Sequence, residues 1–171
     1  MNKEELVLTH FDKQGHPKMV DVHQKDVTSR IAIARAKVLM KKETIELIRN
    51  KKIAKGDVLS VATTAAILAA KRTSELIPMC HPLMIESANV DFKLNENDIE
   101  IEAQVSVSAK TGVEMEALMA VSIAALTIYD MCKSVDRGMT ISEIQLIKKA
   151  GGKSGSWERK DERKNSCISC T

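Results

Sequence analysis

The chain has 171 residues, enough for one domain with a sizeable core, and its 44% hydrophobic and 29% charged residues are typical of a globular protein. Only 2% of the residues are aromatic, so the stacking platforms on which single-stranded nucleic acid binds are missing. The net charge of +3 is too small to indicate nucleic acid or a membrane surface as a partner, although it suits a small anionic ligand.

Location can be inferred from the apolar segments and the cysteines. Residues 1–10 lack the apolar stretch of a signal peptide, and the longest apolar run, residues 58–70, is too short to span a bilayer. The four cysteines are not spaced as a disulfide framework. We therefore expect a cytoplasmic protein with no membrane association and a single domain over residues 1–157.

The first elements in chain order are strands followed by a helix. Residues 19–22 are predicted to form a short strand. Residues 27–40 contain β-branched residues in rough alternation, which favours a strand, with a helix as the alternative. Residues 43–51 have the spacing of a short amphipathic helix.

A second helix is predicted over residues 58–76, and the residues before it suit a phosphate. Asp57 is a favourable N-cap, and Gly56 allows the chain to turn. Lys55 is therefore expected beside free backbone amides at the positive end of a helix dipole, where anions bind. No glycine-rich nucleotide-binding motif accompanies it, so this signal alone does not define a site.

Two prolines flank Cys80 and His81 in the next segment, residues 76–83. Each proline fixes its own backbone and restricts the residue before it, so the loop should be rigid. A thiol and an imidazole on a rigid loop are candidates for a binding or catalytic site. One Cys-His pair does not make a zinc site, and the thiol has no evident catalytic partners. A buried cysteine beside a helix-terminal histidine is the alternative interpretation.

The clearest strands form a hairpin. Residues 84–94 alternate between polar and apolar side chains, and residues 95–98 are typical of a turn. Residues 99–109 alternate almost without exception, so the two segments predict a pair of antiparallel strands.

Residues 111–136 are predicted to form the long helix around which the fold is organised. Thr111 and Glu114 have the spacing of a capping box, and Gly138 follows the expected end. Apolar residues recur at intervals of three and four along one face of this helix: Val113, Ala117, Val121, Ala124 and Ile128.

A second stripe of this helix carries carboxylates at its two ends and small or uncharged residues between them: Glu116, Ala120, Ile123, Thr127 and Asp130. One interpretation is a helix buried against a sheet and against another subunit, and a second places functional groups at the two ends. If the helix packs antiparallel on its own copy, Glu116 of one chain approaches Asp130 of the other, with Lys133 or Lys55 between them.

The C-terminal part contains one further strand, predicted over residues 139–148, and a glycine-rich loop at 150–155 that we expect to be mobile. Residues from 156 onward are polar and irregular, and 158–171 are predicted to be a disordered polar tail in which Cys167 and Cys170 are an incidental pair. The order of elements is that of an α+β, ferredoxin-like βαββαβ fold, an antiparallel sheet with helices on one face.

Three segments together resemble one enzyme family: LIPMCHPL (residues 76–83), KTGVEMEALMAVSIAALTIYDMCKSVD (residues 110–136) and AGGKSG (residues 150–155). Residues 19–22, 55–58 and 69–73 fit the same pattern. The family is that of the cyclic pyranopterin monophosphate synthases, the C proteins of molybdenum cofactor biosynthesis.

The resemblance implies a ferredoxin-like fold assembled as a homohexamer, a trimer of dimers with active sites at the dimer interfaces. It implies a lyase that rearranges 3′,8-cyclo-7,8-dihydroguanosine 5′-triphosphate to cyclic pyranopterin monophosphate and releases pyrophosphate. No cofactor is required by this resemblance, and Mg²⁺ can accompany the triphosphate.

By motif position, Asp130, Lys133 and Lys55 match catalytic residues of that family, and no metal ligand is implied. Glu114 is a weaker candidate for substrate binding than Glu116, because the capping box already explains it. The residues that match substrate-binding positions are Met79, Cys80, His81, Met115, Glu116, Lys71, Arg30 and Lys149.

These residue types suit the implied chemistry. A triphosphate needs cations such as Lys55, Lys71 and Lys133. Asp130 and Lys133 are three residues apart on a helix, so each can tune the other's pKa for proton transfer, although an ordinary surface ion pair is the alternative. For the whole protein, the alternatives are a non-catalytic purine-nucleotide binding module on the same fold and a structural oligomer.

Overall fold

The computed structural model describes residues 14–160, which fold into strands and helices in the predicted order. The strands are β1 (Thr28–Leu39), β2 (Ser87–Leu94), β3 (Asp98–Ala109), β4 (Thr140–Ala150) and β5 (Trp157–Glu158). The helices are α1 (Lys42–Arg49), α2 (Val58–Lys71), α3 (Thr73–Leu76) and α4 (Glu114–Cys132).

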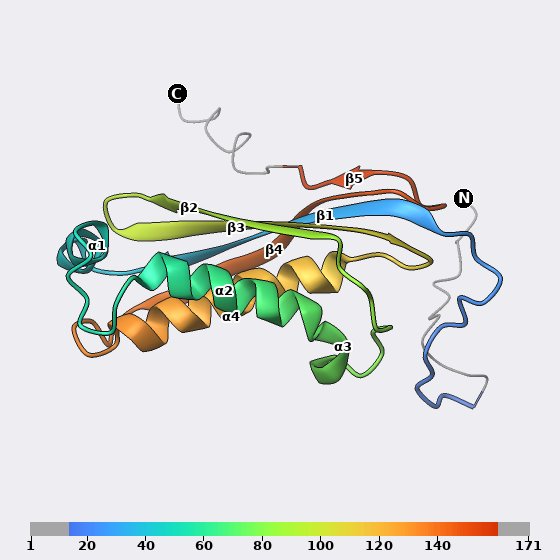
Figure 1. The fold of residues 1–171 in the computed structure, drawn as a ribbon, viewed down its shortest axis with the longest axis horizontal. Coiled ribbons are helices and arrows are strands. Elements are labelled where there is room, and N and C mark those ends of the chain that lie inside the picture. Colours follow the sequence, from blue (N-terminus) through green and yellow to red (C-terminus); the bar gives the residue numbers. More distant parts are fainter. Residues whose placement is uncertain (1–13, 161–171) are drawn as a thin grey trace, which may run out of the picture.

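The strands form one antiparallel sheet in the order β2-β3-β1-β4-β5. Helices α2 and α4 pack side by side against one face of this sheet, and α1 lies at one end (Figure 1). The predicted α+β, ferredoxin-like arrangement with helices on one face is confirmed. The strand prediction for residues 27–40 is also confirmed over the helical alternative.

Alternation along the central strands builds the core between the sheet and the helices. Every second residue of β3 from Ile99 to Ala109 is buried, and so are Ala32, Ala34 and Ala36 of β1. Because these side chains are small on β1, α4 can lie close to the sheet.

Helix α4 is the central element of the helical layer. All five residues of its predicted apolar face, from Val113 to Ile128, are buried. Alanine accounts for four of the five buried residues of α2 and four of the nine of α4. Ala120 of the second stripe is also fully buried within the chain, whereas Leu126 is exposed. Ala120 therefore belongs to the core, whereas Ile123 and Thr127 of the same stripe are partly exposed, and a contact of these two residues with another subunit stays a prediction.

Within the described residues, α4 is also the helix that is long and apolar enough, by length and composition, to cross a bilayer. Half of that apolar stretch is buried inside the protein, and α4 packs on α2, β1 and β3. A core helix of a globular fold has these same properties.

Two of the N-terminal and central predictions are wrong in detail. Residues 19–22 form no regular strand. The helix predicted over 58–76 is interrupted at Arg72, where α2 ends and the single turn of α3 begins. The hydroxyl of Thr73 donates to the carbonyls of Ala69 and Ala70, which closes the last turn of α2.

The capping box at the start of α4 is also wrong. Val113 occupies the N-cap position, and no side-chain hydrogen bond caps the helix. Glu114 instead forms an ion pair with Lys149 of β4, with 3.1 Å between Oε1 and Nζ. A long-range charge pair has therefore replaced the local cap that the spacing of Thr111 and Glu114 suggested.

The predicted irregular tail begins too early. Trp157–Glu158 pairs with Lys148 and Lys149 of β4, and Arg159 fixes this edge through a hydrogen bond from Nε to the Leu146 carbonyl at 2.9 Å. The remainder of the predicted tail, residues 161–171 with its two cysteines, lies outside the described residues.

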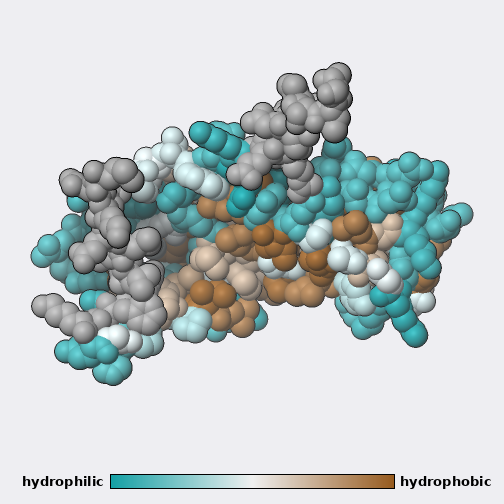
Figure 2. All heavy atoms as spheres, turned by 180° about the vertical axis from the view of Figure 1, so that it is seen from behind, coloured by the Kyte–Doolittle hydropathy of each residue, from teal (hydrophilic) through white to brown (hydrophobic). Residues whose placement is uncertain are grey.

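One face of the molecule leaves apolar surface uncovered. Figure 2, which views the protein from behind, shows a band of apolar side chains across the middle of that face. Large apolar side chains that are about half exposed include Leu126 of α4 and Ile144 of β4, at 54% and 46%. Contiguous apolar surface of this kind usually marks a contact with another molecule.

Candidate functional site

An ion-pair cluster of Lys55, Asp130 and Lys133 lies at the C-terminal end of α4. Lys133 Nζ is 2.7 Å from Asp130 Oδ1, and Lys55 Nζ is 2.9 Å from Asp130 Oδ2 and 2.7 Å from the Asp130 carbonyl oxygen. The hydrogen bonds from Lys133 and then Lys55 hold the pKa of Asp130 at about 2, and Asp130 raises the pKa of Lys133. The side chains of the cluster are about half exposed to solvent.

Lys55 does not lie where the sequence placed it. Asp57 already occupies the N-terminus of α2, where its carboxylate accepts a hydrogen bond from Ser60 N at 3.2 Å and pairs with Lys51. The predicted N-cap is therefore confirmed. The expected neighbourhood of Lys55 is wrong, because its ammonium group reaches across to Asp130 rather than to the amides of α2.

A pocket of about 390 Å³ opens beside the N-terminal end of α4 and the end of β4. Two carboxyl groups, those of Asp26 and Glu114, line it together with a larger number of cations, so the pocket suits an anion. The cations are Lys25, Arg30, Lys110, Lys149 and Lys153.

Hydrogen bonds and glycines fix the cations of this pocket. Arg30 Nε donates to the Ala109 carbonyl at 3.0 Å. A Cβ at Gly152 (φ +71°) would lie 2.5 Å from Arg30 Nη1, and a Cβ at Gly151 (φ +101°) would collide with the backbone oxygen of Ser29. Because only glycine combines positive φ with no side chain, these two glycines allow the loop to close over Arg30.

A second pocket, of about 440 Å³, lies between the loop after α3 and the first turn of α4. Met79, Cys80 and His81 line it from the loop, and Met115 and Glu116 line it from α4. The two predicted substrate-binding segments are therefore brought together by the fold.

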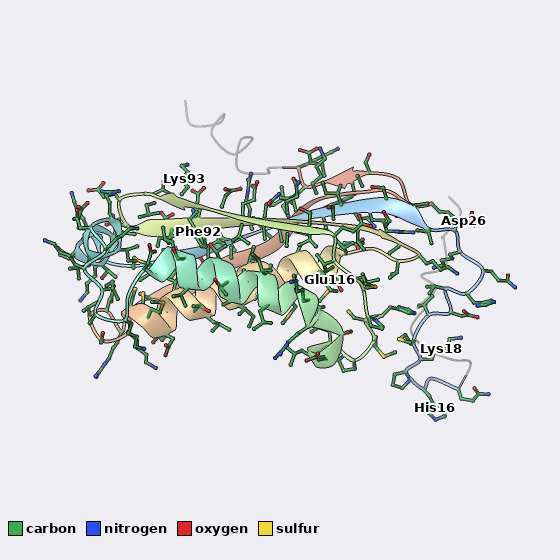
Figure 3. All side chains as sticks on the ribbon, in the orientation of Figure 1. His16, Lys18, Asp26, Phe92, Lys93 and Glu116 are labelled. Atoms are coloured by element: carbon green, nitrogen blue, oxygen red, sulfur yellow. The ribbon has the colours of Figure 1, made fainter. Side chains whose placement is uncertain are left out.

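Glu116 is the unusual group of this second pocket. It lies near the N-terminal end of α4 (Figure 3) and is 3% exposed. Burial raises the pKa of its carboxyl group to about 7, with a further contribution from the charge of Glu114. Burial and then the Glu116 charge raise the pKa of the Cys80 thiol, which disfavours a thiolate nucleophile. Glu116 can therefore exchange a proton near neutral pH.

The two pockets adjoin, because four residues line both: Lys25, Thr111, Gly112 and Glu114. The Lys110 ammonium group donates to the His23 carbonyl at 2.7 Å and so ties the segment before β1 to the wall of the groove. We call these two adjoining pockets the anion groove.

Sequence reasoning missed several polar residues of the anion groove, including Lys153 of the glycine-rich loop. Lys25 and Asp26 lie in the segment before β1, Thr28 is the first residue of β1, and Lys110 precedes α4. Two features of the sequence could have predicted these residues. Lys110 is the first residue of the longest family-like motif, and polar residues are clustered just before Arg30. Thr28 Oγ1 is buried without a partner among the described protein atoms.

The anion groove and the ion-pair cluster are far apart within one chain. Asp130 follows Glu116 by fourteen residues, which is about 21 Å along the helix axis. Figure 1 shows α4 extending along the sheet, so its two ends lie toward opposite ends of the molecule. Lys71, a further predicted site residue, ends α2 and lines neither pocket of the groove.

The acidic, histidine and cysteine side chains do not form a metal site in the described part of the chain. Within residues 14–160, no three His, Cys, Asp or Glu residues are grouped so that they could hold a metal ion.

The fold and the site define a ferredoxin-like protein with a cation-lined pocket beside a buried carboxyl group that can exchange a proton near neutral pH. Residues 19–152 match the model of the MoaC family, and the chain belongs to this family. The motif resemblance stated from the sequence is therefore confirmed.

Close relatives share one name. The cyclic pyranopterin monophosphate synthase of Thermomicrobium roseum is 58% identical over 157 residues, 91% of this chain and 95% of that protein. The protein of that name from Desulfitobacterium hafniense is 58% identical over 161 residues, 94% and 99% of the two chains. The one from Clostridium perfringens is 59% identical over 152 residues, 88% and 96%.

Proposed function

We propose that this protein is a cyclic pyranopterin monophosphate synthase of molybdenum cofactor biosynthesis. It converts 3′,8-cyclo-7,8-dihydroguanosine 5′-triphosphate to cyclic pyranopterin monophosphate and releases pyrophosphate. The observation that carries this proposal is the anion groove, in which five cations surround a pocket next to the buried Glu116. A triphosphate binds to such cations, and rearrangement of the purine ring needs groups that exchange protons near neutral pH.

The proposed roles in the groove follow from the chemistry of its two ends. Arg30 and Lys149 bind the phosphates, since a guanidinium and an ammonium group are held there by neighbouring groups. The rearranging base lies in the second pocket, beside Glu116. The remaining proposed substrate contacts in the groove are Met79, Cys80, His81, Met115 and Glu114. Lys71, which lies outside the two pockets at the end of α2, is proposed as a further cation for the triphosphate.

The ion-pair cluster supplies the catalytic groups in this proposal. Asp130 is ionised at any physiological pH and holds the ammonium groups of Lys55 and Lys133 within 3 Å of its oxygens. Two fixed ammonium groups can neutralise negative charge that develops as pyrophosphate leaves, and either can transfer a proton to the substrate.

Two chains complete each active site in this proposal. One substrate in the anion groove cannot also reach an ion-pair cluster that lies about 21 Å away along α4 of the same chain. A second chain packed over the uncovered apolar surface brings its own cluster to the groove (Figure 2). We propose dimers of this kind, assembled as a trimer of dimers in the cytoplasm.

The proposal includes no resident cofactor, and Mg²⁺ enters only as a counter-ion of the triphosphate. Elemental analysis of the purified protein should therefore find no stoichiometric metal. One tightly bound zinc per chain, with unfolding on chelation, would contradict this part of the proposal.

Turnover by the purified protein tests the function. We expect pyrophosphate release from the cyclic triphosphate in a one-to-one ratio with the pterin product. Tight binding of the triphosphate without release of pyrophosphate would instead indicate a nucleotide-binding module.

Complementation tests the two-chain site separately. Glu116→Ala and Lys133→Ala, each inactive alone, are unfolded together and refolded. Half of randomly formed dimers are mixed and contain one intact site, so about a quarter of the wild-type activity should return. A mixture of Lys55→Ala and Lys133→Ala is the matched control and should stay inactive, because both lysines contact the same Asp130 in one chain. No recovery with the first pair would refute the two-chain site.

A further inference from the structure

Asp136 is a buried carboxylate just beyond the ion-pair cluster. It is 2% exposed and follows Lys133 by three residues. Its Oδ2 accepts hydrogen bonds from Lys41 N at 2.9 Å and Thr44 Oγ1 at 3.2 Å, and its Oδ1 accepts one from Gly138 N at 3.1 Å. A buried charge is tolerated only with such donors, so the carboxylate is held in one position.

The bonds to Lys41 and Thr44 join the end of α4 to the start of α1. Lys41 is the N-cap residue of α1, and its own side chain makes no capping hydrogen bond. Asp136, 95 residues away in the sequence, supplies the missing acceptor and places its negative charge at the positive end of the helix dipole. One side chain thereby connects two elements that are distant in sequence.

On the α4 side, hydrogen bonds fix the turn that contains Lys133. The N–H of Lys133 donates to the Tyr129 carbonyl at 2.9 Å, and the N–H of Asp136 donates to the Cys132 carbonyl at 3.0 Å. The Tyr129 hydroxyl donates to the Arg137 carbonyl at 3.2 Å. The backbone of Lys133 is therefore held between α4 and the anchored Asp136.

On the α1 side, a hydrogen-bonded segment leads from the helix to Lys55. Lys52 N donates to the Leu47 carbonyl of α1 at 2.8 Å, and Gly56 N closes a turn on the Ile53 carbonyl at 3.0 Å. Ile53 is buried, which anchors this segment in the core. Movement of α1 relative to α4 would therefore displace Lys55 from Asp130.

We infer that Asp136 is a positioning residue that holds α1 against the end of α4, so that the ammonium groups of Lys55 and Lys133 meet at Asp130. Lys55 and Asp130 are 75 residues apart in the sequence, and the Asp136 connection adds to the packing of α2 on α4 in keeping them in contact. The inference rests on the proposed function, in which these three side chains carry catalysis.

The ionisation of Asp136 agrees with this role. Burial acts to raise its pKa, and the hydrogen bonds from Lys41, Gly138 and Thr44 more than offset it, so the pKa lies below its ordinary value. The carboxylate therefore accepts all three hydrogen bonds at neutral pH.

The test follows Asp130 directly in the full-length protein. In Asp136→Ala, the pKa of Asp130, measured by carbon-13 NMR of its carboxyl carbon, should rise from about 2 toward 3.8, because the two lysines are no longer held against it. The kcat for pyrophosphate release should fall about 100-fold with little change in KM, since the anion groove is untouched. Asp136→Asn, which keeps the shape and one acceptor, should change both quantities in the same direction by less.

Val105→Ala is the matched control, because it removes buried volume from β3 and touches none of the Asp136 hydrogen bonds. It should lower the melting temperature and leave the pKa of Asp130 at about 2. The inference would be overturned if the pKa of Asp130 stayed unchanged in a folded Asp136 variant, or if it rose equally in Val105→Ala. It would also be overturned if the pKa of Asp130 rose in Asp136→Ala while the kcat stayed the same. The proposed function is refuted if the wild-type protein fails to release pyrophosphate. The NMR titration needs no substrate, so it still tests the role of Asp136 in that case.

Discussion

The two ends of α4 carry carboxylates in opposite environments. Glu116 in the first turn is buried and has a pKa of about 7, whereas Asp130 in the last turn is exposed, paired with two lysines, and has a pKa of about 2. Burial determines the first value and cationic hydrogen-bond donors determine the second. One helix therefore presents a group that exchanges protons at neutral pH at one end and a permanently charged anchor at the other.

The two carboxylates differ in pKa because one is buried and the other is paired with cations. Their surroundings, rather than their residue type, therefore determine the role of each carboxylate. In the proposed two-chain site the opposite ends of two α4 helices meet. Glu116 of one chain then supplies or accepts protons, and Asp130 of the other keeps two ammonium groups in place. Changes confined to one end of α4 should therefore have effects that the other end does not reproduce.

The largest effect is expected at the lysine end. Lys133→Ala and Lys55→Ala should each lower the rate of pyrophosphate release by at least about 100-fold, because each removes a fixed positive charge from the reacting phosphates. The oligomeric state should not change. Lys52→Ala, at an exposed lysine of the segment after α1, is the matched control and should retain near-normal turnover. Near-normal rates in both cluster variants would refute the catalytic role of the cluster.

The next largest effect concerns stability at the Glu116 end. The pKa of Glu116 is raised from 4.5 to about 7, so the buried neutral form is favoured and stability is lost as pH rises from 4.5 through 7. Relative to Glu116→Gln, which stays neutral, the wild-type free energy of unfolding should fall by about 3 kcal/mol over this window. Urea denaturation at pH 4.5, 6 and 8 measures this difference. If the difference in the free energy of unfolding between the wild type and Glu116→Gln did not depend on pH, Glu116 would not be a buried group that titrates in this range.

These contrasts also show what could be predicted from the sequence. The buried face of α4 and the alternation of β3 were predictable because both follow from local periodicity. Lys55 was assigned to the wrong neighbour, since its contact with Asp130 spans 75 residues and depends on tertiary packing. Glu114 was assigned to a local cap, although Lys149 pairs with it from another strand. Burial of Glu116, and hence its raised pKa, likewise depends on the tertiary packing of the loop after α3.

A smaller effect is expected from the glycines that shape the groove. Gly151→Ala should destabilise the protein by about 1–3 kcal/mol, because its positive φ is strained for alanine and its Cβ meets the Ser29 carbonyl. The KM for the triphosphate should rise as Arg30 is displaced, without the kcat loss of the lysine variants. Gly155→Ala is the matched control, since its φ is also positive, at +64°, and nothing lies within 4 Å of the added Cβ. Equal effects of the two substitutions on KM would show that loop strain, rather than the wall of the groove, causes the change.

The smallest change in stability is expected from Asp130→Asn. The pKa of Asp130 is lowered from 3.8 to about 2, so its ion pairs contribute stability that is present above pH 3.8 and is lost only as pH falls through 2. Because the cluster is exposed and screened by salt, that contribution should be too small to resolve between pH 5 and 8.

Turnover should nevertheless fall in Asp130→Asn, since the two ammonium groups lose the anion that positions them. Glu46→Gln is the matched control, because Glu46 forms an equally exposed pair with Arg49 and lies in α1, outside the anion groove. Urea midpoints of both variants and the wild type should coincide at pH 7, and turnover should drop in Asp130→Asn alone. If Asp130→Asn lowered the free energy of unfolding at pH 7 by as much as the pH effect expected for Glu116, the contrast between the two ends of α4 would be wrong. The Asp130 cluster would then stabilise the fold instead of being an exposed, preorganised group.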